Sequence, residues 1–125
     1  MRIRKAGFSE ELASLVRGLF PKAEPLFTEK DLYFVAEERG IVGFVHLIDS
    51  EKGLLLQGIG VLPEWRGKGI GGELLDASVK VAEREGKDIF LKVKPDNPAL
   101  NLYHKKGFTL KKMKGVYILE KKRMN

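Results

Sequence analysis

The densest cluster of glycines in the 125-residue chain carries its clearest chemical signal. Residues 66–72 read Arg-Gly-Lys-Gly-Ile-Gly-Gly and lie between an apolar run, residues 54–62, and an amphipathic run, residues 73–85. This order predicts a strand, a glycine loop and the first turn of a helix. N–H groups that open a helix have no intrahelical acceptor and lie at the positive end of its dipole, so such a loop binds anions. Arg66 and Lys68 add two cations, which suits a diphosphate.

Two common phosphate-binding loops do not fit these residues. A P-loop places Ser or Thr after its Gly-Lys pair to bind magnesium, whereas Lys68 is followed by Gly69. Residues 67–72 satisfy G-x-G-x-x-G, but a dinucleotide-binding loop begins directly after its strand, and here residues 63–66 intervene. The pattern that remains is R-x-x-G-x-G, over residues 66–71.

A second segment strengthens the interpretation of the first. Residues 97–108 read Asn-Pro-Ala-Leu-Asn-Leu-Tyr-His-Lys-Lys-Gly-Phe. Together, the two segments resemble the signatures of the GNAT superfamily of N-acetyltransferases, which are [RQ]-x-x-G-x-[GA] and N-x-A followed by L-Y-x-K-x-G-F. The resemblance implies one α/β (α+β) domain over residues 1–125, with a mixed, mostly antiparallel sheet of about six to seven strands, one parallel pair and about four helices.

The resemblance also implies that the glycine loop and the preceding strand hold acetyl-CoA as a co-substrate. Backbone amides of the loop would bind the diphosphate, and the pantetheine arm would pair with the main chain of residues 54–61 like a further strand. For the arm to pass, the resemblance implies that residues 54–61 and 88–93 splay apart at their far ends. The expected cofactor-binding residues are Ile59, Gly60, Val61, Arg66, Gly67, Lys68, Gly69, Ile70, Gly71, Gly72 and Asn97. No metal is expected, because the chain has no cysteine and only two histidines.

Acetyl transfer to an amine requires a neutral amine, a polarised carbonyl and a proton for the leaving thiolate. The resemblance implies that Tyr103 supplies this proton; the alternative is a tyrosine that only packs its ring against the sheet. A backbone N–H at Val61 would polarise the carbonyl. In many relatives a glutamate on the strand equivalent to residues 54–61 acts as the general base, but this strand has no acidic residue. The base is therefore not identified, and the distant candidates Glu37, Glu38 and His46 are expected at the surface.

Hydrophobic patterns predict the elements that position these motifs. Strands are expected at residues 2–5, 31–38, 41–49, 54–61, 88–93, 108–111 and 116–120, and helices at residues 10–20, 70–85 and 99–106, with a loop or short irregular helix over 22–28. A crossover helix requires residues 88–93 to run parallel to residues 54–61. Gly58 and Gly60 indicate a bulge or a close backbone approach in that strand.

Composition limits the location and the partners of the protein. No apolar run is long enough to span a membrane, and no apolar stretch follows the charged N-terminus as in a secretory signal, so we expect a cytoplasmic protein. The net charge of +6 suits a polyanion such as CoA. We expect a monomer or homodimer whose partners are a CoA thioester and an amine acceptor.

Two other functions stay open at this stage. One is a non-catalytic module of the same fold that binds or senses acyl-CoA. The other is a basic nucleic-acid-binding protein, and the positive net charge is the one feature that supports it. Within the enzyme hypothesis, residues 20–30 and the hairpin near Gly115 would shape the acceptor site. Its occupant is a protein N-terminus, a lysine, a polyamine or a small metabolite.

Overall fold

The computed structural model of the chain describes residues 1–123. The elements are β1 (Arg2–Ala6), α1 (Glu10–Leu19), β2 (Asp31–Glu37), β3 (Ile41–Ser50), β4 (Gly53–Val61), the 3-10 helix η1 (Pro63–Trp65), α2 (Ile70–Glu85), β5 (Ile89–Val93), α3 (Leu100–Lys105), β6 (Thr109–Lys114) and β7 (Val116–Lys121). The strands form one seven-stranded sheet in the order β1-β2-β3-β4-β5-β7-β6. Among the described strands, β4 and β5 are the parallel pair and the other neighbours are antiparallel, so the predicted fold class is confirmed.

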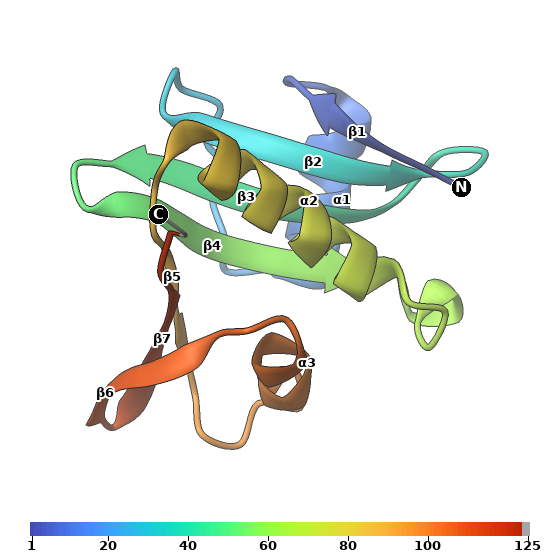
Figure 1. Cartoon of the computed structure of the whole chain (residues 1–125). Helices are drawn as coiled ribbons and strands as arrows, with labels where there is room; N and C mark the ends of the chain where they lie inside the picture. Colours follow the sequence, from blue (N-terminus) through green and yellow to red (C-terminus); the bar gives the residue numbers. More distant parts are fainter. Residues whose placement is uncertain (124–125) are drawn as a thin grey trace.

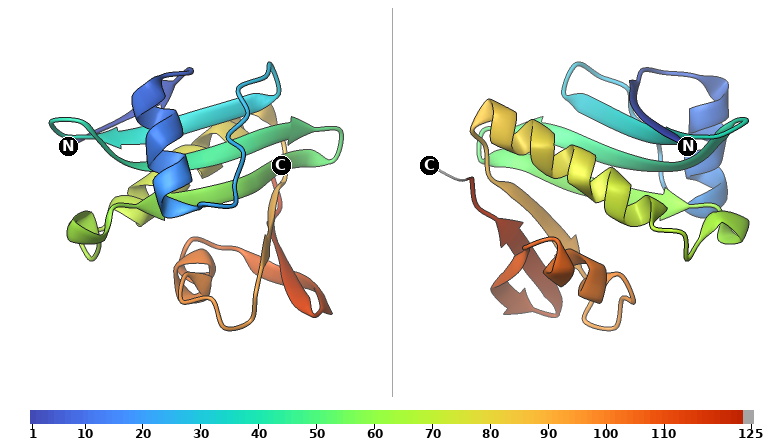
Figure 2. Two further views of the ribbon diagram at one scale, coloured as in Figure 1. Left: turned by 180° about the vertical axis from the view of Figure 1, so that it is seen from behind. Right: turned by 45° about the vertical axis from the view of Figure 1, so that its right-hand side comes forward.

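The helices divide the sheet into two covered faces. α2 lies across one face of β2, β3 and β4 (Figure 1), and α1 lies across the other face (Figure 2). We call these the α2 face and the α1 face. β5, β7, β6 and α3 form an arm that turns away from the first four strands, with α3 on the same side of the sheet as α2.

Local sequence signals explain where α1 begins and ends. Ser9 caps its N-terminus, since the Ser9 hydroxyl accepts a hydrogen bond of 3.1 Å from the Leu12 N–H. Leu12, Leu15 and Val16 recur at helical spacing and are buried against the α1 face. The helix ends before Pro21, which has no N–H to continue it.

α2 is bounded by glycines in the left-handed region of backbone space. Gly69 precedes the helix with φ of 83°, and Gly86 follows it with φ of 65°. Leu74 and Leu75 on one side of α2 are fully buried in the main core. The helix therefore returns the chain to the same end of the sheet, which makes β5 parallel to β4.

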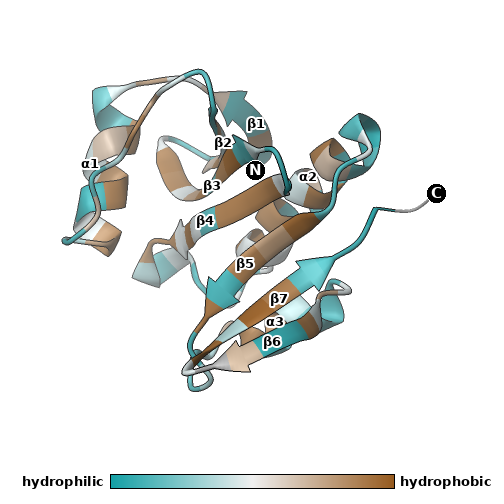
Figure 3. Ribbon diagram, turned by 90° about the vertical axis from the view of Figure 1, so that its left-hand side faces the viewer, coloured by the Kyte–Doolittle hydropathy of each residue, from teal (hydrophilic) through white to brown (hydrophobic). Residues whose placement is uncertain are grey.

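β4 and β5 separate soon after they begin. Their register contains two pairs, Leu54 with Ile89 and Leu55 with Phe90. Both strands are mostly hydrophobic (Figure 3). The splay that the family resemblance implied is therefore present.

A bulge lies in β4 at the point where the two strands separate. His46 of β3 pairs with Gly58 and the adjacent Leu47 pairs with Leu56, which leaves Gln57 as the extra residue. Further along β4, a Cβ atom on Gly60 would lie 2.9 Å from Leu19 Cδ1 of α1. Of the two alternatives expected for the glycines of this strand, the bulge is confirmed, whereas the close neighbours of Gly60 are side chains and not another backbone.

Residues 20–30 form a loop that is attached to the sheet by polar contacts. The Asp31 carboxylate accepts hydrogen bonds from the Thr28 N–H (2.9 Å) and the Thr28 hydroxyl (2.6 Å) through one oxygen. Its other oxygen accepts a hydrogen bond of 2.5 Å from His46 Nε2. The Tyr33 hydroxyl donates to the Leu26 carbonyl at 3.0 Å, and its ring stacks on His46 with 4.1 Å between centroids. His46 is therefore buried under this loop, and its expected place at the surface is wrong.

The order of the last two strands was not predicted. β7 lies between β5 and β6, so the C-terminal strand joins the hairpin to the rest of the sheet. The turn of this hairpin is at Gly115, which has φ of 73°. The arm therefore consists of residues that follow α2 in the sequence.

We predict that the burial of His46 makes the fold sensitive to mild acid. Burial lowers the pKa of His46 below its ordinary 6.5, an effect that the neighbouring Asp31 carboxylate only partly offsets. The unfolded chain then binds a proton at His46 before the folded chain does. This stability is present above about pH 6.5 and is lost as the pH falls through the lowered pKa of the folded state.

Urea unfolding at pH 7.5 and at pH 5.5 measures this effect. The wild type should lose stability between the two values, and His46→Gln should lose less, because it has no group to titrate there. His104→Gln is the matched control, since His104 is exposed, and it should behave as the wild type does. An equal loss in the wild type and in His46→Gln would contradict the prediction.

Candidate functional site

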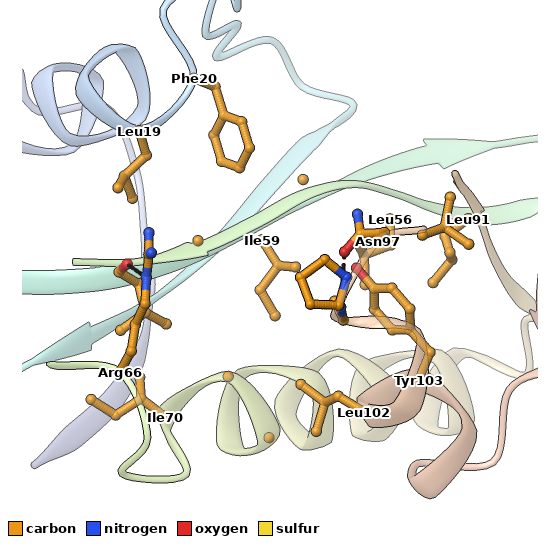
Figure 4. A pocket seen from close by; sticks show the side chains of 18 of the residues that line it. Leu19, Phe20, Leu56, Ile59, Arg66, Ile70, Leu91, Asn97, Leu102 and Tyr103 are labelled. Carbon is orange, nitrogen blue, oxygen red and sulfur yellow. Dashed lines mark hydrogen bonds between the residues drawn. The ribbon is translucent and has the colours of Figure 1, made fainter. Parts of the chain in front are cut away.

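A cleft of about 890 Å³ opens where β4 and β5 separate. One wall is β4 from Leu56 to Val61, and the other is the arm, from β5 and α3. The end of α1 and the glycine loop close its two remaining sides, and Figure 4 shows ten of the lining side chains with labels. The lining residues are Leu19, Phe20, Leu56, Gln57, Gly58, Ile59, Gly60, Val61, Trp65, Arg66, Gly67, Gly69, Ile70, Gly71, Gly72, Leu91, Lys92, Val93, Asn97, Pro98, Ala99, Leu102 and Tyr103.

The glycine loop presents backbone N–H groups at one end of the cleft. Gly67 and Gly69 both have positive φ, of 77° and 83°, and the first hydrogen bond of α2 runs from the Glu73 N–H to the Gly69 carbonyl. The N–H groups of residues 70–72 therefore precede the intrahelical bonds and are available to an anion. A Cβ atom added to Gly67 or Gly69 would meet no neighbour within 4 Å, so glycine is required there by backbone conformation and not by lack of space.

Cations surround this loop. Arg66 lines the cleft, and its Nε donates a hydrogen bond of 2.9 Å to the Val61 carbonyl at the end of β4. Lys68 is exposed on the loop and is not among the lining residues. Lys106 comes from the other wall, since its Nζ would lie 3.6 Å from a Cβ atom on Gly72, and it forms an ion pair of 3.0 Å with Asp76 of α2. The positive helix end and these side chains together favour a group with more than one negative charge.

The backbone of β4 offers a row of free groups to the cleft. The Leu62 N–H donates to the Val42 carbonyl at 2.9 Å, so the neighbouring pairs of this antiparallel ladder alternate between bonded and non-bonded types. Ile59 and Val61 fall in the non-bonded pairs, and their N–H and C=O groups point away from β3. β5 has already separated from β4 at this level, so an extended ligand can pair as a strand would with the N–H and C=O of Ile59 and the N–H of Val61, whereas the Val61 carbonyl already accepts from Arg66 Nε.

Tyr103 lies on α3 at the opposite end of the cleft from Arg66 (Figure 4). Its side chain is 5% exposed, and its ring packs edge-on against Phe108 with 5.9 Å between centroids. Burial raises the pKa of Tyr103 above its ordinary 10, so the phenol remains protonated at neutral pH. The packing role that the sequence left open is thus present, and the residue also lines the cleft.

Asn97 lies near Tyr103 in the cleft (Figure 4). Its side-chain oxygen accepts a hydrogen bond of 2.8 Å from the Ala99 N–H and so fixes the turn that leads into α3. The side-chain NH₂ group is left to donate to a ligand. The chain thus uses one half of this amide for structure and presents the other half to the cleft.

The lining of the cleft carries positive charge and, within residues 1–123, no negative charge. Arg66 and Lys92 are its charged side chains. The distant base candidates lie elsewhere: Glu37 binds Arg4 at 2.9 Å, and Glu38 binds the N-terminal amine at 3.0 Å.

No group of metal-ligating side chains occurs among the described residues, and no helix in that part of the chain is long and apolar enough to cross a membrane.

The structure brings nearly all of the predicted site residues together. Lys68, at the exposed apex of the loop, is the predicted residue outside the lining. Sequence reasoning missed Leu19 of α1, Leu91 and Lys92 of β5, and Lys106, whereas Phe20 falls in the segment 20–30 that it assigned to the acceptor site. No local motif marks these positions. The alternation of apolar and charged residues over 91–94 would have placed Lys92 on the face opposite Leu91.

A family profile identifies the family of this chain. The profile of a family described as "Acetyltransferase (GNAT) domain" matches residues 29–110, which include both motifs. A search of curated protein sequences gives no match.

Solved structures with the same fold include several complexes with CoA. The PaiA N-acetyltransferase of Thermoplasma acidophilum, in complex with coenzyme A, has a TM-score of 0.77 at 20% identity, covering 98% of this chain and 99% of the other. A Bacillus subtilis acetyltransferase in complex with CoA has a TM-score of 0.84 at 16% identity, with coverage of 98% and 99%. The ribosomal-protein-S18-alanine N-acetyltransferase of Escherichia coli has a TM-score of 0.76 at 17% identity, with coverage of 95% and 92%. These TM-scores show a common fold, and the profile match over residues 29–110 shows that the chain belongs to the GNAT acetyltransferase family.

Proposed function

We propose that this protein is an acetyl-CoA-dependent N-acetyltransferase that moves an acetyl group directly from the thioester to an amine. The observation that carries this proposal is one cleft with an anion-binding loop at one end and a buried, protonated phenol at the other. Between them lies unpaired strand backbone. Solved relatives of this fold are described as complexes with CoA, which supports acetyl-CoA as the donor.

The chain's own residues fit each part of the donor. The N–H groups of residues 70–72 suit the diphosphate, with Arg66 and Lys106 nearby. The outward backbone groups of Ile59 and Val61 suit the two amides of a pantetheine arm. A ligand laid along these groups would place its thioester beside Tyr103, at the end of the cleft where β4 and β5 meet.

Tyr103 is the proposed proton donor to the leaving thiolate. For the carbonyl, the sequence suggested the Val61 N–H, but Val61 lies at the Arg66 end of β4, as its hydrogen bond to Arg66 shows. The Ile59 N–H points into the same cleft closer to Tyr103 (Figure 4), so we assign the polarising hydrogen bond to Ile59. Asn97 would hold the donor through its side-chain NH₂.

Deprotonation of the amine does not require an acidic side chain in this cleft. Lys92 is a cation on the cleft wall, and a nearby like charge lowers the pKa of a bound ammonium group. The amine proton would then leave to water that enters the open side of the cleft.

Among the described residues, neither a cysteine nor a serine lines the cleft, which supports direct attack by the amine instead of a covalent enzyme intermediate.

The rival proposal is a non-catalytic module that binds or senses acyl-CoA. It is favoured by one observation, the lack of Asp, Glu and His among the described lining residues. The two proposals differ in a simple assay. Both require acetyl-CoA binding, but only the enzyme releases free CoA thiol when amines are added. The expected cytoplasmic location, and the expected monomer or homodimer, remain predictions.

We predict that Gly69→Ala weakens acetyl-CoA binding more than it weakens the fold. Alanine at a left-handed position costs about 1–2 kcal/mol, and relief of that strain would turn the loop amides away from the ligand. Calorimetric titration with acetyl-CoA should show a loss of affinity of at least about tenfold, and thermal unfolding should show a modest drop in Tm.

Gly86→Ala at the other end of α2 is the matched control. Gly86 also has positive φ and no atom within 4 Å of a Cβ position, but it lies away from the cleft. It should cost similar stability and leave the affinity for acetyl-CoA unchanged. Equal affinity losses in the two variants would count against the loop as the diphosphate site.

We predict that Tyr103→Phe lowers kcat by about a hundredfold while the dissociation constant of acetyl-CoA changes little. The reason is that phenylalanine keeps the buried ring and its packing on Phe108 but removes the proton donor. Tyr117→Phe serves as the control, because Tyr117 is a half-buried tyrosine of β7 that does not line the cleft. Steady-state release of free thiol measures both variants, and unchanged turnover in Tyr103→Phe would remove Tyr103 from the mechanism.

A further inference from the structure

We infer that the amine acceptor carries a carboxylate close to its amine, and that Lys92 binds this carboxylate. The inference rests on the proposed function and deepens it, because it names the substrate class of the same site. The loop that would bind the donor opens α2, and Tyr103 lies in the core under α2, so the donor is assigned to the α2 face of the cleft.

Side-chain directions along β5 identify the face that remains for the acceptor. Leu91 and Val93 are buried in the main core with Tyr103, so they point to the face covered by α2 and α3. Lys92 lies between them and points to the opposite face, where its side chain is exposed. On this face β4 presents Gly58, whose Cβ position has no neighbour closer than 3.9 Å, whereas Leu19 of α1 packs on Gly60 further along the strand. The acceptor can therefore reach the thioester from the α1 face.

Lys92 stands at the level where the cleft begins. β5 runs parallel to β4 in the register of Leu55 with Phe90, so Lys92 lies two residues beyond the last pair, opposite the bulged Gln57. The labelled neighbours Leu91, Leu56 and Tyr103 mark this end in Figure 4. Lys92 is thus beside the reacting end of the cleft and distant from the anion-binding loop. No carboxylate among the described residues forms a salt bridge with it.

A second cation lies on the same face of the arm. Ile118 of β7 pairs with Lys92 on one side and with Lys112 of β6 on the other, and direct cross-strand partners share a face. The nearest carboxylate on this face, that of Glu120, is 15% exposed and forms an ion pair of 3.6 Å with Lys111. The acceptor side of the arm therefore carries two lysines, Lys92 and Lys112, on either side of the apolar Ile118.

This charge pattern discriminates among the possible acceptors. A polyamine or a lysine side chain brings positive charge with no carboxylate to compensate it, and the described lining offers it no acidic partner. An amino acid brings a carboxylate that the Lys92 ammonium group can bind. The geometry thus favours a small amino acid over a cationic amine.

A panel of matched acceptors tests the inference with acetyl-CoA as donor and free thiol as the readout. The panel holds free L-amino acids, the carboxamide of each, spermidine, and a short peptide with a free N-terminal amine. At least one free amino acid should show kcat/KM about tenfold or more above its own carboxamide and above spermidine. Faster turnover of spermidine or of the carboxamides would overturn the inference.

Lys92→Gln isolates the residue. It should reduce kcat/KM for the preferred amino acid, mainly through KM, by about tenfold or more beyond any loss that it causes for the carboxamide of that amino acid. Its affinity for acetyl-CoA in calorimetric titration should equal that of the wild type. Lys52→Gln is the control with the same charge change, since Lys52 is exposed in the turn between β3 and β4 and away from the cleft.

These measurements distinguish a wrong function from a wrong acceptor class. If the protein fails to bind acetyl-CoA, the proposed function fails. If it binds acetyl-CoA and acetylates spermidine in preference, the function stands and the acceptor class is wrong. If Lys92→Gln loses activity equally toward an amino acid and its carboxamide, then Lys92 does not bind a carboxylate. Lys112→Gln gives an independent measurement of the same preference, with a smaller loss expected because Lys112 is further from the cleft, beyond β7.

Discussion

The constraint on which the molecule depends is the early separation of the parallel strands β4 and β5. Backbone N–H and C=O groups of a central strand normally find partners on both sides, and a buried group left without one is costly. Here the separation occurs after two residue pairs, and the outward groups of Ile59 and Val61 face an open cleft. The site therefore uses groups that every strand has, and it needs only that the neighbouring strand be absent.

Three devices keep the strands apart without loss of the core. The bulge at Gln57 changes the course of β4 where the gap starts, and the end of α1 packs on Gly60 to hold the far part of the strand. On the other side, α3 packs Tyr103 against the arm, so the proton donor and the wall of the cleft belong to one packed unit. A change in any of these contacts would alter the width of the cleft and the position of the phenol together.

The parts of this design that are local in sequence could be predicted. The glycine loop, the helix after it, and the capping residues Ser9 and Gly86 depend on neighbours along the chain, and they were located from the sequence. The parallel pair followed from the length of the crossover. Long-range choices could not be derived in this way: the position of β7 between β5 and β6, the burial of His46 under residues 20–30, and the exposure of Lys92 on the acceptor side all depend on how distant segments meet. The gap between β4 and β5 was expected from family resemblance alone, because nothing in the alternation of residues 54–61 or 88–93 specifies it.

The position of β7 has a consequence for biosynthesis. β5 is bordered on one side by the cleft and on the other by β7, so a nascent chain that still lacks residues 116–121 leaves β5 with an open edge along most of its length. Such an edge can pair with other growing chains. The last of the described strands to emerge from the ribosome is therefore the one that covers this edge, and the ligand groove becomes complete only once that strand has been made.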